Sequence, residues 1–99
     1  MGAHRTPAEG HVGRDEIERR LGELGSPSWW SNSAHEQYAA HSHPYHKVLY
    51  CVAGSIIFHV GGENHLLGPG DRLEVEPHTE HSASVGPDGV QCGEVAVDD

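Results

Sequence analysis

The sequence predicts an all-β domain, a sandwich or a barrel, preceded by one short helix. Short apolar or alternating runs follow one another from Trp29 to Val97, with turn-forming residues about every ten positions. The 13 glycines and 6 prolines in 99 residues interrupt the chain too often for a helical bundle, whereas 35% hydrophobic residues are too many for a disordered chain. This length allows one domain with one core.

The chain before the β region falls into two parts. Residues 1–13 combine glycine, proline and polar residues without a period, so we expect a flexible N-terminal tail. Residues 14–28 are expected to form a short helix and a linker, because Ile17, Leu21 and Leu24 fall on one helical stripe and a glycine and a proline follow them. A helix this short is marginal alone, so it should lie against an apolar surface.

The β domain is expected over residues 29–97. Its strands are the segments in which β-branched and aromatic residues gather or alternate with polar ones. In chain order these are 29–30, 37–40, 48–52, 56–60, 65–67, 73–77, 81–85 and 90–97. A core this small leaves strand edges to cover, so we expect a homodimer that uses outward apolar residues such as Val48 and Tyr50.

Charge and composition exclude several classes of protein. The formal net charge of −9 lacks the basic footprint of a nucleic-acid-binding domain. Apolar runs are too short for a membrane span or for the apolar region of a signal peptide. Cys51 and Cys92 are too few for a secreted disulfide scaffold, so we expect a reduced, cytoplasmic protein without a nucleic-acid or membrane partner. Cys92 is expected to be a small buried apolar residue.

The histidines carry the strongest chemical signal. The chain has ten of them, and His41, His43 and His46 lie within six residues. On a strand, positions 41 and 43 point to the same face, so their imidazoles can share one cation. Imidazole suits several transition metals and does not choose among them. The competing interpretation is a polar loop with unrelated surface histidines, but that interpretation leaves His46 and His81 unexplained.

At these positions the chain resembles the cupin superfamily. The first cupin signature places His-x-His before an acidic residue, usually Glu, and then a Gly; here the positions are His41, His43, Lys47 and Gly54. The second signature runs from a Gly through Pro and Gly to a His; here the positions are Gly70, Glu76, His78 and His81. The resemblance covers residues 29–97. It implies a double-stranded β-helix, or jelly-roll barrel, in which His41, His43 and His81 bind one divalent transition metal (Zn, Fe, Ni, Mn or Cu).

Lys47, the only lysine of the chain, stands where that family usually has its Glu ligand. A protonated ammonium beside three imidazoles would repel a divalent cation. Three outcomes are open: Lys47 turns out of the site and His46 becomes a fourth ligand, Lys47 is neutral and serves as a base or amine nucleophile, or the site holds no metal and binds an anion. Tyr45 and His78 are expected to line the pocket together with Lys47.

These residues are compatible with three functions. The first is a metal-binding cupin that acts on a small molecule as a metalloenzyme, since three ligands leave coordination positions open. The second is a non-catalytic ligand-binding or metal-sensing module with a weakened site. The third is a structural barrel whose site has decayed. The missing Glu favours the second and third, and the retained histidines favour the first and second. A fold of this type does not decide among them.

Overall fold

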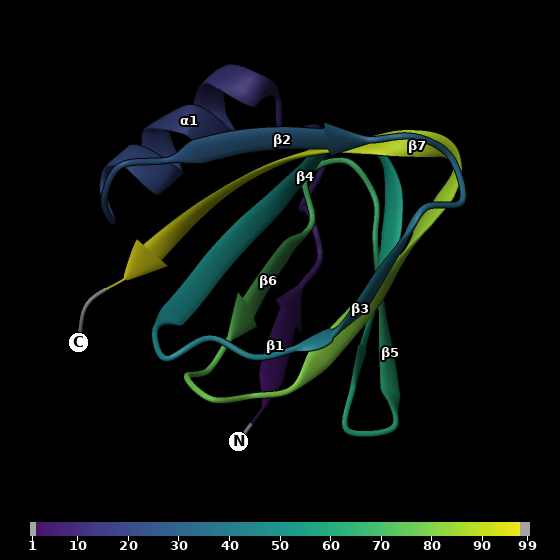
Figure 1. Cartoon of the computed structure of the whole chain (residues 1–99). Helices are drawn as coiled ribbons and strands as arrows, with labels where there is room; N and C mark the ends of the chain where they lie inside the picture. Colours follow the sequence, from purple (N-terminus) through teal and green to yellow (C-terminus); the bar gives the residue numbers. More distant parts are fainter. Residues whose placement is uncertain (1, 98–99) are drawn as a thin grey trace.

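The computed structural model describes residues 2–97 as an antiparallel barrel with one helix beside it (Figure 1). The elements are β1 (Ala3–Thr6), α1 (Arg14–Gly22), β2 (Ser28–Asn32), β3 (Gln37–His41), β4 (His46–Val60), β5 (Glu63–Leu67), β6 (Arg72–Val75) and β7 (His81–Val97). The strands pair in the order β1-β6-β4-β7-β2, with β3 on β7 and β5 on β4. This jelly-roll architecture confirms the predicted fold class. Within residues 2–97, no helix has the length and apolar character needed to cross a membrane.

The two long strands, β4 and β7, bend together where we expected chain reversals. Each of them unites two predicted strands, and the pairing shifts between Gly54, opposite Val90, and Ile56, opposite Val85. Gly54 has a φ of 75°, and a Cβ at this position would collide with the carbonyl oxygen of Gly89. The glycine-rich segments therefore fold the sheet at a bulge without reversing the chain.

The apolar side chains of the described residues form two clusters. The larger fills the barrel and consists of Leu49, Cys51, Ile56, Phe58, Val60, Leu67, Leu73, Val75, Ala83, Val85, Val90 and Cys92. The smaller lies outside the barrel, where α1 covers β4 and β7. The buried position of Cys92 agrees with the expectation.

Helix α1 covers the surface that we expected to serve a dimer. Ile17 and Leu21 pack on Val48 and Tyr50, each of which is 2% exposed. The expectation that these two strand residues are outward contacts for a second copy is therefore wrong, because the helix of the same chain buries them. The homodimer itself stays a prediction, but it cannot use Val48 and Tyr50 as its contact surface.

The N-terminal segment joins the barrel. Ala3–Thr6 form β1, which pairs with β6 and lies at the edge of the sheet, so the expectation of a flexible tail is wrong for these residues. The carboxylate of Asp71 holds the segment by accepting from the Ala8 N–H at 2.8 Å and pairing with Arg5 at 3.3 Å. Burial opposes ionisation of Asp71, but these contacts and the N–H of Gly68 outweigh it and lower its pKa.

Candidate metal centre

Three histidines meet at one end of the barrel. His41 ends β3 and lies directly opposite His81, the first residue of β7, while His43 follows in the loop before β4. One ring nitrogen of each histidine lies within 4.8 Å of the others. The ring centroids of His41 and His81 are 4.4 Å apart, and that of His43 is 4.8 Å from His41 and 5.4 Å from His81. The pairing of β3 with β7 thus unites the two distant motifs.

Backbone carbonyls orient two of these rings. Nδ1 of His41 lies 2.8 Å from the Ala39 oxygen, and Nδ1 of His81 lies 2.8 Å from the Thr79 oxygen. A carbonyl oxygen can only accept, so each Nδ1 carries the proton and each Nε2 keeps a lone pair. Metal-binding histidines are commonly fixed through their second nitrogen in this way.

The buried nitrogen atoms fit a metal ion. Within residues 2–97, Nε2 of His43 and Nε2 of His81 are buried without a hydrogen-bond partner. Burial lowers the pKa of both histidines, and nearby Lys47 and His41 lower them further. Both rings are therefore neutral at neutral pH, the state in which imidazole binds a metal. Buried polar nitrogen atoms without a hydrogen-bond partner are costly unless another group satisfies them. The donor set thus suits a divalent transition metal.

A cavity of about 250 Å³ opens beside the three histidines, inside the barrel. The residues around it are Trp30, Tyr38, His41, His43, Tyr45, Lys47, Phe58, His81, Ala83 and Glu94. Its aromatic walls are ordered: Tyr45 stacks on His43 with centroids 4.9 Å apart, and Tyr38 meets Trp30 edge-on at 5.7 Å. Tyr45 is therefore one of the residues that line this cavity.

Lys47 points into this cavity and has a carboxylate for a partner. Its residue is 8% exposed, and its Nζ lies 3.5 Å from Oε2 of Glu94. The indole N–H of Trp30 donates to Oε1 of the same carboxylate at 2.7 Å. The sequence reasoning missed Glu94. A signal existed, because Glu94 lies two positions from Cys92 on β7, and alternate residues of a strand share a face.

His46 and His78 lie outside the cavity. His46 precedes Lys47 on β4, so its side chain lies on the opposite face, where Nε2 is 3.1 Å from Oε1 of Glu74. The structure thus has the reverse of the first outcome considered for Lys47: the lysine faces inward and His46 does not approach the three histidines. His78 is exposed in a turn and contributes its backbone N–H, which donates to the His43 oxygen at 2.6 Å.

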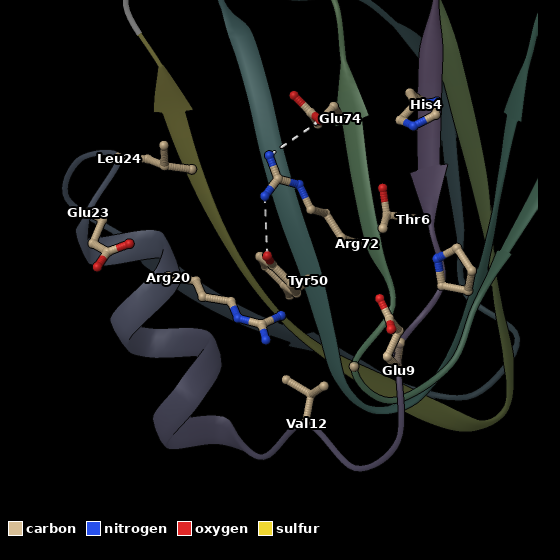
Figure 2. Close-up of a pocket in the computed structure, with 13 residues that line it drawn as sticks. His4, Thr6, Glu9, Val12, Arg20, Glu23, Leu24, Tyr50, Arg72 and Glu74 are labelled. Atoms are coloured by element: carbon tan, nitrogen blue, oxygen red, sulfur yellow. Dashed lines mark hydrogen bonds and ion pairs between the residues drawn. The ribbon is translucent and has the colours of Figure 1, made fainter.

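A second hollow, of about 470 Å³, lies outside the barrel between α1 and the strands (Figure 2). It is larger than the cavity at the histidines, but its two arginines already have carboxylate partners. Arg72 lies 3.3 Å from Glu74, and Arg20 lies 2.7 Å from Glu16. Its two arginines are thus paired with acids of the same chain. Among the described residues, this hollow therefore offers no set of unpartnered polar atoms comparable to the histidine nitrogens.

Comparison with known proteins supports the assignment of the fold. Residues 31–89 match the family described as Cupin domain. No curated protein matches the chain. Among solved structures, a cupin superfamily protein of Desulfitobacterium hafniense is 16% identical with a TM-score of 0.68, and the match covers 74% of this chain and 66% of that one.

Two enzymes have similar folds. The polyketide cyclase RemF of Streptomyces resistomycificus is 20% identical with a TM-score of 0.66, and the match covers 74% of this chain and 54% of the cyclase. The DMSP lyase DddQ of Ruegeria pomeroyi is 22% identical with a TM-score of 0.68, and the match covers 74% of this chain and 38% of the lyase. At these identities the likeness concerns the fold alone. With the family match spanning more than half of its residues, the chain belongs to the cupin family.

Proposed function

We propose that this protein binds one divalent transition metal through His41, His43 and His81 and binds a small molecule in the adjoining cavity. The observation that carries the proposal is the pair of buried Nε2 atoms, on His43 and His81, that have no hydrogen-bond partner within residues 2–97. An ion bound to three imidazoles keeps open positions and would supply Lewis-acid polarisation of a ligand oxygen. Tyr45 and Trp30 would hold the body of the ligand.

Metal content tests this proposal. The protein is purified without a metal-affinity column, and elemental analysis is expected to give about one transition metal per chain, as a single mononuclear site requires. His41→Ala and His81→Ala should lose the metal while their far-ultraviolet spectra stay those of a β protein. His11→Ala removes an exposed histidine that is distant in sequence from His41, His43 and His81, and it serves as the matched control. Equally low metal in wild type and in all three variants would overturn the proposal.

One observation favours a binding module without turnover. Lys47 and Glu94, the charged side chains among the residues lining the cavity, are engaged with each other at 3.5 Å. A general base or acid must be within reach of the proton that it transfers. Here each charged group is already paired with the other. In this function the metal-loaded protein binds its ligand and releases it unchanged.

The catalytic alternative rests on Tyr45. Burial raises the pKa of this hydroxyl, and the charge of Glu94 raises it further, so the phenol stays protonated and able to donate at neutral pH. The similar folds of a polyketide cyclase and a DMSP lyase are compatible with an enzyme. Turnover of any member of a small-molecule panel by wild type, lost in Tyr45→Phe with metal content unchanged, would establish the enzyme. Ligand binding without turnover would establish the module.

A further inference from the structure

The cavity beside the histidines has an unusual charge balance for a metal site. Lys47 is the cation among the side chains that line it, and Glu94 is the carboxylate. The two lie 3.5 Å apart, so their charges offset each other. A divalent ion on three neutral imidazoles would keep its full positive charge, since no further lining carboxylate neutralises it. A carboxylate at position 47 would instead have offset that charge.

The ammonium of Lys47 keeps donors for a ligand. An ammonium has three N–H groups, and one carboxylate oxygen of Glu94 lies at ion-pair distance from it. The other oxygen of Glu94 accepts from the Trp30 indole at 2.7 Å, which holds the carboxylate in place. Trp30 and Glu94 thus fix Lys47 at the wall of the cavity, with its charge directed inside the barrel.

The size and walls of the cavity restrict the body of the ligand. Its volume of about 250 Å³ lies below the range that drug-sized ligands occupy. Trp30, Tyr38, Tyr45 and Phe58 present aromatic rings to it. Aromatic rings pack best on flat groups, either offset-stacked or edge-on. The walls therefore favour a small, planar, largely apolar body that carries one polar group.

We propose that the cavity takes a small planar carboxylate, of the class of a one-ring aromatic acid, and that Lys47 is the residue that selects the anion over its neutral analogue. This inference rests on the metal site proposed above, because the ion contributes the excess positive charge. The carboxylate supplies the missing negative charge, and the ring lies among the aromatic walls. A charge-assisted hydrogen bond from Lys47 fixes the orientation of the acid.

Benzoate and benzamide, which differ in charge and little in shape, test the selection. Isothermal titration of the zinc-loaded protein is expected to give benzoate a dissociation constant at least about tenfold below that of benzamide, the scale of one hydrogen bond to a charged group. Lys47→Met should lose most of this preference, and Lys47→Arg should keep it. Arg19→Met, which removes one positive charge from a side chain that is 58% exposed, is the control and should behave as wild type.

The double variant Lys47→Met/Glu94→Gln covers the case in which the single change leaves Glu94 unpaired and unfolds the protein. It should also lose the preference. Zinc content, measured on the same samples, separates this inference from the metal site. If the protein binds zinc but binds both probes with equal affinity, or binds neither, the selection of anions is overturned and the metal site is retained. A preference for benzoate that depends on Lys47 in protein that binds no zinc overturns the metal site and keeps Lys47 as the selecting residue.

Discussion

The ammonium of Lys47 and the carboxylate of Glu94 lie 3.5 Å apart inside the barrel, although 47 positions (94 − 47) separate them in the chain. Their strands are neighbours: Lys47 lies opposite Ala96, and Leu49 lies opposite Glu94. The side chain of Lys47 is 10% exposed and that of Glu94 is 22% exposed. At such burial, each charge depends on the other for compensation.

Removing both partners of this pair should destabilise the fold by less than the two single removals added together. Lys47→Met is expected to lower the free energy of unfolding by on the order of 2 kcal/mol, less than for a fully buried pair because water reaches Glu94. The double variant Lys47→Met/Glu94→Gln should cost less than the sum of the single changes, with a coupling of about 1 kcal/mol. Urea denaturation of the three metal-free variants measures both quantities. Strict additivity would show that the two charges do not interact.

The sequence motifs identify the histidine cluster, but they do not identify the carboxylate beside it. Two motifs named His41, His43 and His81, and the pairing of β3 with β7 does bring them together. Glu94 belongs to no motif. Its place in the cavity depends on the register of β7 against β4, which is a long-range property of the sheet.

The elements that were predicted wrongly have a local sequence pattern that is typical of a different structure. Ala3–Thr6 are mostly exposed, so no apolar alternation marks them as a strand, and their order depends on pairing with β6. Glycine and proline at residues 86–89 have the composition of a turn, yet they form a bulge within β7. Composition alone does not distinguish a chain reversal from a bend shared by two paired strands.

The bend at Gly54 should tolerate no side chain. Gly54→Ala is expected to lower the free energy of unfolding by more than about 2 kcal/mol, because the residue has a φ of 75° and its Cβ would meet the Gly89 carbonyl. Gly61→Ala is the matched control. Gly61 has a φ of 55° but open space around the Cβ position, so its cost should stay near the ~1 kcal/mol of backbone strain alone. Equal costs, measured by thermal and urea unfolding, would contradict the close approach.

Helix α1 should contribute to stability through its buried face. Leu21 is fully buried against Val48 and Tyr50, so Leu21→Ala is expected to cost about 2–5 kcal/mol. Leu24 is 38% exposed, and Leu24→Ala should cost less than about 1 kcal/mol. Both values come from denaturation curves. A small loss for both leucines would indicate that the helix does not cover the outer face of β4 in solution.

The carboxylate of Asp71 should make stability depend on pH in the acid range. Its pKa is lowered in the folded protein, since the backbone N–H groups of Gly68 and Ala8 and the guanidinium of Arg5 together outweigh the effect of burial. The unfolded chain has the ordinary value near 3.9, so between the two pKa values the unfolded state binds more protons. The stabilisation by Asp71 is therefore complete above about pH 4 and is lost as the pH falls through the lowered pKa of the folded state.

In Asp71→Asn, urea midpoints at a series of pH values should fall less steeply in this range than in wild type, and hydrogen exchange should show faster opening of β1. Asp15→Asn, at an exposed position on α1, is the control and should keep the wild-type slope. Parallel curves for wild type and Asp71→Asn would contradict the role of this carboxylate in holding the N-terminal strand.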